Sequence, residues 1–277
     1  MNFLYSCYLP FAKKNALIKE LSFNSYKNLV KNITNNNNKS IDILLEDIVK
    51  THVIDLPPCN FLEKIIILLT IRAVCVSDKL ELTLGSKNFK QDINIIDFIK
   101  KIEDINLDNF YNKKISLNND IDVTLKIPNQ LYYEDEYISF IETVFLNGSE
   151  YPVTEEILNN LPANIFKEIN EFKRDLEILL SKVCLFMIKN PADLSENIEI
   201  FLSSNVQSIF DFLKFIFKRD LLSFYEIEFF LFTKMNMSLE DLDRITPAEI
   251  DIYINLFKKD LEDRNKQTKS PVDIPQP

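Results

Sequence analysis

The stretch NFLEKIIILLTIRAVCVSDKLELTLG, residues Asn60–Gly85, decides the fold. Its first half is apolar on almost every face, as in a helix that is buried in a protein core or in a membrane. Asn60 followed by Glu63 matches a helix N-cap with a capping box, and Pro57 and Pro58 prevent an earlier helix start. We therefore expect a buried helix that begins after Asn60.

The same stretch argues for a core helix and against a membrane span. A span needs about 20 predominantly apolar residues, and this run contains Glu63, Lys64 and Arg72. Within Leu80–Leu84 the leucines alternate with polar residues, which is the period of a half-buried strand. We expect the rest of the chain to pack on this helix and strand.

The other elements are predicted from the same two periods. Expected strands are Tyr5–Leu9, Asn15–Leu21, Phe89–Ile95, Lys113–Leu117, Asp120–Ile127 and Ile198–Leu202. Expected helices carry Tyr26–Ile33, Ile41–Val49, Ile95–Ile105, Ala163–Lys189, two Phe-rich segments within Phe210–Phe232, Ser238–Asp243 and a last segment that starts at Thr246. Tyr137–Leu146 fits a strand or a short helix, and we favour the strand.

These elements predict an α+β fold, with an N-terminal mixed part of short antiparallel strands around a buried helix and a C-terminal helical part. From Thr154 onward the pattern is almost entirely helical. We predict an α+β N-terminal domain over residues 1–152, a helical C-terminal domain over 153–265 and a flexible proline-rich tail over 266–277. The 277 residues also fit a single large domain.

The charge limits the classes of partner. A net charge of -10 argues against general nucleic-acid binding, because phosphate contacts need a basic surface. It also argues against binding to anionic membrane surfaces, and we expect no membrane insertion. The opening MNFLYSCYLPFAKK has no basic segment before an apolar one, so we expect no signal peptide.

Two scarce residue types exclude several common sites. The two glycines, Gly85 and Gly148, are too few and too far apart for a Walker A loop, a GxGxxG turn or a GxSxG nucleophile elbow. His52 is the single histidine, which removes multi-histidine metal sites. We interpret His52 as a surface or helix-capping residue, and we predict neither a cofactor nor a catalytic site.

The remaining candidate sites are weak. The cysteines contain no CxxC pair, so we expect buried free thiols in a reducing compartment, with a zinc site or a disulfide as the alternative: Cys7, Cys59, Cys75 and Cys184. Asp120 with Asp122 and Asp241 with Asp243 have the spacing of cation ligands, but such pairs are frequent in an acidic chain. We predict no metal site. An enzyme with an unrecognised acidic site stays open as an alternative.

Three segments together resemble a known family. They are YLPFAKKNALIKELSFNSYKNLVKNI at 8–33, FLEKIIILLTIRAVCVSDKLELT at 61–83 and MSLEDLDRITPAEIDIYINLFKKDLEDRN at 237–265. Their order is similar to that in baseplate hub, or hub-assembly, proteins of T-even-like contractile-tailed bacteriophages. The motifs are structural and none is a catalytic signature. The region Asn88–Lys234 matches only in general character.

The resemblance implies a non-enzymatic protein that binds other baseplate or tail proteins, either in the virion tail baseplate or in the host cytoplasm during assembly. Resident hub subunit and transient assembly factor both fit. Interfaces of this kind use aromatic anchors, and the candidates are Phe210, Phe217, Phe224, Phe230, Tyr132 and Tyr133. For most of the Phe-rich residues we favour a place in the core, with an exposed patch for a protein partner as the alternative. A chaperone or adaptor for another large assembly, such as a tail tube or secretion machinery, is the alternative function. The oligomeric state is left open.

Overall fold

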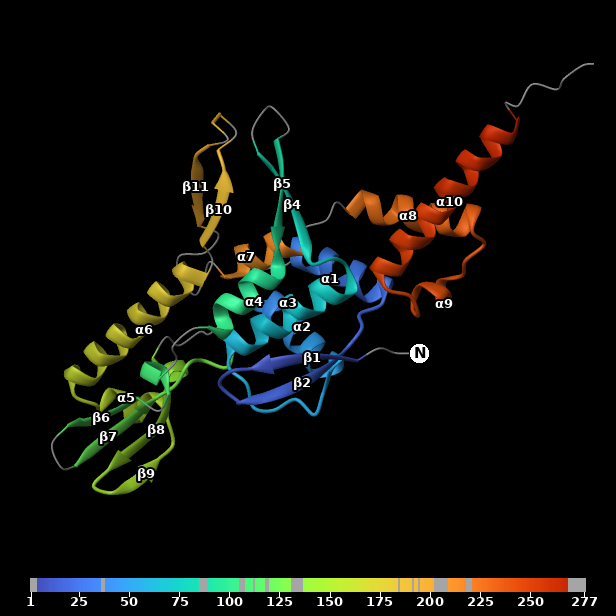
Figure 1. The fold of residues 1–277 in the computed structure, drawn as a ribbon. Coiled ribbons are helices and arrows are strands. Elements are labelled where there is room, and N and C mark those ends of the chain that lie inside the picture. The colour runs from blue at the N-terminus through green and yellow to red at the C-terminus, as the bar shows by residue number, and fades with distance from the viewer. Residues whose placement is uncertain are drawn as a thin grey trace, which may run out of the picture.

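The structure is a computed structural model that describes residues 4–35, 38–84, 89–104, 108–111, 113–117, 120–130, 137–183, 185–190, 192–193, 195–201, 209–217 and 221–268. Helix α3, Phe61–Cys75, lies at its centre (Figure 1). The predicted capping box is confirmed: the Asn60 side chain accepts from the Glu63 N–H at 3.1 Å, and Glu63 Oε2 accepts from the Asn60 N–H at 3.3 Å.

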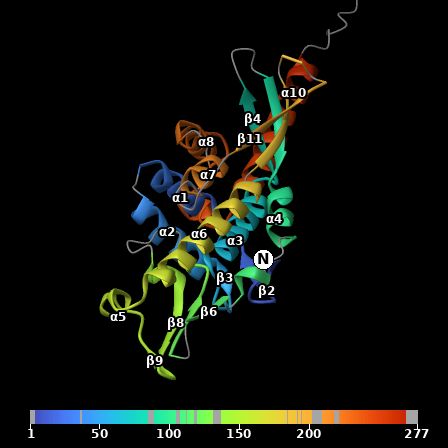
Figure 2. The same cartoon turned by 90° about the vertical axis from the view of Figure 1, so that its left-hand side faces the viewer.

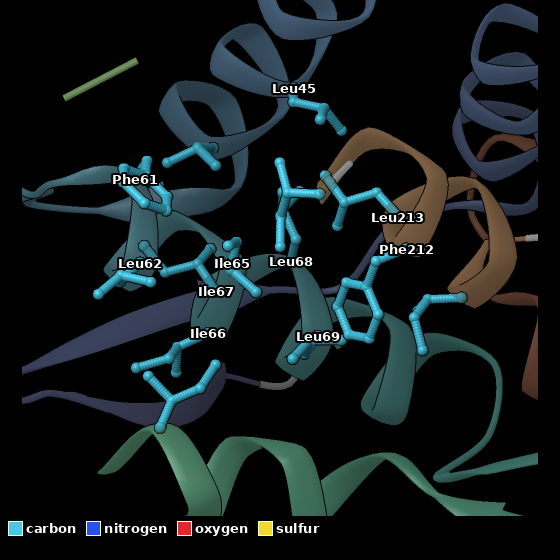
Figure 3. Packing of buried hydrophobic residues seen from close by; sticks show 14 of the residues in the cluster. Leu45, Phe61, Leu62, Ile65, Ile66, Ile67, Leu68, Leu69, Phe212 and Leu213 are labelled. Atoms are coloured by element: carbon cyan, nitrogen blue, oxygen red, sulfur yellow. The ribbon is translucent and has the colours of Figure 1, made fainter. Parts of the chain in front are cut away.

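Thirteen of the fifteen residues of α3 are buried, so neighbouring elements cover every face of this helix. The three-stranded antiparallel sheet β1 (Leu4–Leu9), β2 (Lys14–Lys19) and β3 (Val53–Ile54) packs against it. So do α2 (Asn38–His52) and α4 (Ile95–Glu103). Figure 3 shows leucine and isoleucine side chains of α3 facing Leu45 of α2 and Phe212 and Leu213 of α7 (Ile209–Ile216).

Two charged residues at the start of α3 are also buried, and each one attaches a different segment. Glu63 Oε1 accepts from the Ala12 N–H at 2.7 Å, in the turn between β1 and β2. The Lys64 ammonium pairs with the Glu46 carboxylate of α2 and donates to the Asn129 carbonyl at 2.5 Å. These contacts satisfy polar groups that would otherwise be costly in a core. They explain how a core helix accommodates the charges that interrupt its apolar run.

Two hairpins extend from the same side of the molecule (Figure 1). The first pairs β4 (Lys79–Leu84) with β5 (Phe89–Asn94) and leads into α4, where the Asn94 side chain accepts from the Ile96 N–H at 2.9 Å. The second pairs β10 (Leu185–Lys189) with β11 (Asn197–Phe201). The hairpins lie side by side, and the Lys189 N–H of β10 donates to Gln91 Oε1 of β5 at 2.8 Å.

The prediction of one helix over Ala163–Lys189 is wrong at its C-terminal end. Helix α6 spans Ala163–Val183, and the rest of the predicted helix forms β10. A short apolar run fits either type of element. Here the pairing with β11 and the hydrogen bond from Lys101 Nζ to the Leu185 carbonyl, 2.6 Å, favour the strand. The predicted brief strand near Ile198–Leu202 is confirmed as β11.

A four-stranded antiparallel sheet forms one end of the molecule. Its order is β6 (Lys113–Leu117), β7 (Ile121–Leu125), β8 (Ile141–Leu146) and β9 (Ser149–Tyr151). The open choice for Tyr137–Leu146 is resolved: one 3-10 turn, Ile138–Phe140, precedes strand β8. Gly148 has φ +76° in the turn that follows, a conformation that favours glycine. Another 3-10 turn, Asp108–Phe110, precedes the sheet.

The other helices lie around this frame and confirm the α+β class. They are α1 (Phe23–Asn35), α5 (Glu155–Asn159), α7, α8 (Leu221–Lys234), α9 (Leu239–Leu242) and α10 (Pro247–Thr268). The turned view in Figure 2 shows α7 and α8 beside α1, and α8 contacts α1. Buried hydrophobic residues from both predicted domains form one cluster. The division into domains over 1–152 and 153–265 stays a prediction, and the sequence makes no prediction of whether the two halves fold independently.

Two further expectations concern the tail and the membrane. Helix α10 includes the first three residues of the predicted tail, 266–268, and residues 269–277 lie outside the described part of the chain. None of the helices that the structure describes combines the length and the apolar character required to cross a membrane.

Candidate protein-binding surface

The phenylalanines predicted as partner anchors are mostly core residues. Phe210 and Phe217 are 1% exposed and Phe224 is 0% exposed. The Phe224 ring lies 5.5 Å from that of Phe23 and 5.8 Å from that of Tyr26, both on α1. A partner reaches these three side chains only by opening the core, so we do not retain them as surface anchors. The physical reason is that Phe210 and Phe224 lie on the inward faces of α7 and α8, whereas Phe217 follows α7 and packs against Tyr26, with ring centroids 6.3 Å apart.

The other predicted anchors differ from these three. Phe230 is half-buried and makes an edge-to-face contact with Phe257 of α10, with ring centroids 5.0 Å apart and planes at 82°. It therefore joins α8 to α10. Tyr132 and Tyr133 lie outside the described residues.

Three of the four carboxylates in the two predicted pairs have structural partners. Lys114 Nζ lies 2.6 Å from Asp122 Oδ2, and this hydrogen bond holds the pKa of that carboxyl below its ordinary value. Asp241 closes the capping box of α9 with Ser238. The Asp243 carboxylate accepts from Asn24 Nδ2 at 2.8 Å. Among the described residues, no three His, Cys, Asp or Glu side chains converge as metal ligands would.

A polar cavity of about 270 Å³ lies beside the start of α3 and is a candidate location for an acidic enzyme site. Its walls include Cys59, Glu63, Lys126 and Glu142. Both Glu63 oxygens already accept backbone N–H groups, as described above. Burial raises the pKa of the Cys59 thiol to about 11, so little thiolate forms at neutral pH. These groups do not form a nucleophile and base pair.

Exposed apolar side chains gather instead on the last three helices. Sixteen large hydrophobic residues are exposed among the described side chains, and eight of them belong to α8, α9 and α10. These eight are Leu222, Tyr225, Phe229, Leu239, Ile252, Tyr253, Leu256 and Leu261. Single exposed hydrophobic residues are ordinary, but a concentration of this kind marks an interaction surface.

On α8 the exposed residues form one stripe, which we call the α8 stripe: Leu222, Tyr225 and Phe229. Their exposed fractions are 61%, 49% and 69%. Spacings of three and four residues place them on one face of the helix. Phe224 and Leu231 lie on the opposite face and are fully buried. Helix α8 is therefore apolar on both sides, although only one side contacts the core.

The α8 stripe is held in place by charges at its edge. Lys27 Nζ donates to Glu228 Oε1 at 2.7 Å and lies 5.4 Å from the centre of the Tyr225 ring. The ion pair joins α1 to α8 and neutralises the lysine. Glu226, on the exposed side of α8, leaves the neighbourhood of the stripe acidic.

The sequence contains the spacing of the α8 stripe but not its exposure. Phe224 and Leu231 on the inner face are as hydrophobic as Leu222 and Phe229 on the outer face, so periodicity does not separate the two faces. Only the position of α1, which covers Phe224, decides which residues face solvent.

No protein-family model matches the chain, and searches of curated proteins and of solved structures found no match.

Proposed function

We propose that the chain is a non-enzymatic protein of a contractile phage tail baseplate hub, which binds other tail proteins through the α8 stripe. It acts either as a resident hub subunit or as a factor in hub assembly. The observation that carries the binding role is the exposure of Leu222, Tyr225 and Phe229 on one face of a helix whose other face is in the core. Exposed aromatic residues are the side chains that protein interfaces use most effectively.

Contacts between the resembling segments support the phage assignment. The Ala12 N–H donates to Glu63, which joins the first segment to the second. The Phe23 N–H donates to the Ile245 carbonyl at 2.7 Å, which joins the first segment to the third. A resemblance shared by three segments, the first of which contacts the other two, is consistent with one common structural unit.

The charge of the chain favours a particular kind of partner. With a net charge of -10 and Glu226 beside the stripe, the surface favours an apolar patch that is surrounded by basic residues. Such complementarity increases the rate of encounter more than it increases affinity.

The test uses a tagged chain in cells that produce the phage encoding it. We expect tail baseplate proteins to co-purify with the chain, as identified by mass spectrometry. Substitution Phe229→Asp should remove them, whereas Ile43→Asp, at an exposed position on α2, should not. Recovery from finished particles as well identifies a resident subunit, and recovery only from producing cells identifies an assembly factor. Recovery of no tail protein would overturn the phage assignment.

A further inference from the structure

The outer face of α10 carries a second exposed apolar pair, separate from the α8 stripe. On the inner face, Ile250 is buried and Phe257 contacts Phe230 of α8. Each helical residue advances by about 100° around the axis, which directs Ile252 and Leu256 away from that contact. Both side chains are 59% exposed.

Two opposite charges bracket this pair on the same face. Glu249, Ile252, Leu256 and Lys259 follow one another at spacings of three, four and three residues, so they form one stripe, which we call the α10 stripe. Glu249 and Lys259 are both exposed. The stripe is symmetric in size and opposite in charge about its midpoint, Ile254. The acidic and basic ends lie five residues on either side of Ile254, and the two aliphatic residues lie two residues on either side.

We infer that α10 pairs antiparallel with α10 of a second copy of this chain, about a two-fold axis near Ile254. Antiparallel pairing places Ile252 of one copy against Leu256 of the other. It also places each Glu249 against the Lys259 of the other copy. A two-fold interface uses the same patch on both subunits, so it must be complementary to itself. The α10 stripe meets that condition.

The projection of α10 from the molecule supports the same occupant. From Lys258 through Arg264 every side chain is exposed, and Figure 1 shows this half of the helix extending beyond the other elements. A helical segment without tertiary contacts is marginally stable in water. Pairing with a second α10 supplies the missing contacts. Asp260, next to the stripe, is paired with Arg264 at 2.8 Å, and Glu249 and Lys259 are the charges that flank the aliphatic pair.

The proposed dimer does not use the α8 stripe. It can therefore be tested independently of the proposed function. The test is sedimentation velocity on the full chain. We expect a concentration-dependent dimer, and we expect Ile252→Asp to raise its dissociation constant by about tenfold or more. Ile43→Asp should leave the dissociation constant unchanged. A wild-type chain that stays monomeric up to about 100 μM would overturn the inference, because weaker association has little occupancy at such concentrations.

Charge-reversal variants distinguish specific antiparallel pairing from nonspecific hydrophobic association. Lys259→Glu alone places two acids against each other, and Glu249→Lys alone places two bases against each other. Each variant should therefore dimerise about tenfold more weakly. An equimolar mixture of the two variants restores both attractive contacts and should recover the wild-type dimer. Glu249 also accepts from the Thr246 N–H in the helix cap, at 2.8 Å, so a merely structural defect in Glu249→Lys persists in the mixture. Failure of the mixture to recover would contradict antiparallel pairing.

Discussion

The Arg72 Nε–H donates to the backbone carbonyl of Ile216 at 3.3 Å and thereby joins the central helix α3 to the end of α7. The same guanidinium donates to the Ser77 carbonyl at 2.7 Å, where α3 gives way to β4. One buried side chain thus connects segments that lie 144 residues apart in the chain.

We predict that Arg72→Met destabilises the protein, although methionine is apolar and of similar length. The substitution leaves the carbonyls of Ile216 and Ser77 without their donor in a buried environment, at a cost of about 1–3 kcal/mol. The measurement is the free energy of unfolding in urea. Arg264→Met is the matched control, since its ion pair with Asp260 is solvent-exposed, and it should change stability by less than about 0.5 kcal/mol. Equal effects of the two substitutions would contradict this account.

Two phenylalanines on α8 provide a comparison within one helix. Phe224→Ala should lower the free energy of unfolding by about 3–5 kcal/mol, because it leaves a cavity beside Phe23 and Tyr26. Phe229→Ala should lower it by less than about 0.5 kcal/mol, because that ring is mostly exposed. Among variants that remain folded, Phe229→Ala should weaken partner binding more than Phe224→Ala does. A large stability loss in Phe229→Ala would place this ring in the core and remove it from the binding surface.

The single histidine predicts a pH dependence of stability. Burial lowers the pKa of His52 from 6.5, and a hydrogen bond with the Glu20 backbone opposes this shift. Nδ1 is buried and has no hydrogen-bond partner among the residues that the structure describes. The folded protein therefore binds the proton less tightly than the unfolded chain does. The contribution of His52 to the free energy of unfolding is fully present above the pKa of the unfolded chain. It is lost as the pH falls through the pKa of the folded protein.

The measurement compares wild type with His52→Gln in urea between pH 7 and pH 5. We expect the stability of wild type relative to the variant to decrease toward pH 5. The comparison is needed because burial raises the pKa of Glu63, whose protonation stabilises the folded state as the pH falls. A constant difference between the two proteins across this range would show that His52 does not titrate differently on folding.

The thiol of Cys59 should react slowly although it lies at the wall of a cavity. Burial raises its pKa to about 11, which keeps it protonated at pH 8. After allowing for the higher nucleophilicity of a more basic thiolate, we expect iodoacetamide to modify Cys59 about tenfold more slowly in the native protein than in the urea-unfolded chain. Peptide mapping by mass spectrometry gives the rate at this cysteine. Equal rates in both states would show a freely accessible thiol with an ordinary pKa.

Local signals along the chain are sufficient for the capped starts of α3 and α10 and for the alternating strand β7. The capping box at Asn60 and Glu63 was predicted correctly because all of its hydrogen bonds lie within four consecutive residues. The start of α10 was predicted for the same reason, since the Glu249 N–H donates to Thr246 Oγ1 at 3.2 Å. The strand β7 was predicted from alternation, which reports directly that one of its faces is buried.

The sequence by itself determined the α+β class, the buried central helix and most element boundaries, because these depend on contacts between residues that are close along the chain. Only the tertiary structure decided that Leu185–Lys189 leaves the helical pattern, because that strand depends on pairing with β11. Only the tertiary structure decided that Phe224 is in the core and Phe229 faces solvent. Both lie on a helix whose inner and outer faces are apolar, and the packing of α1 selects which face is covered.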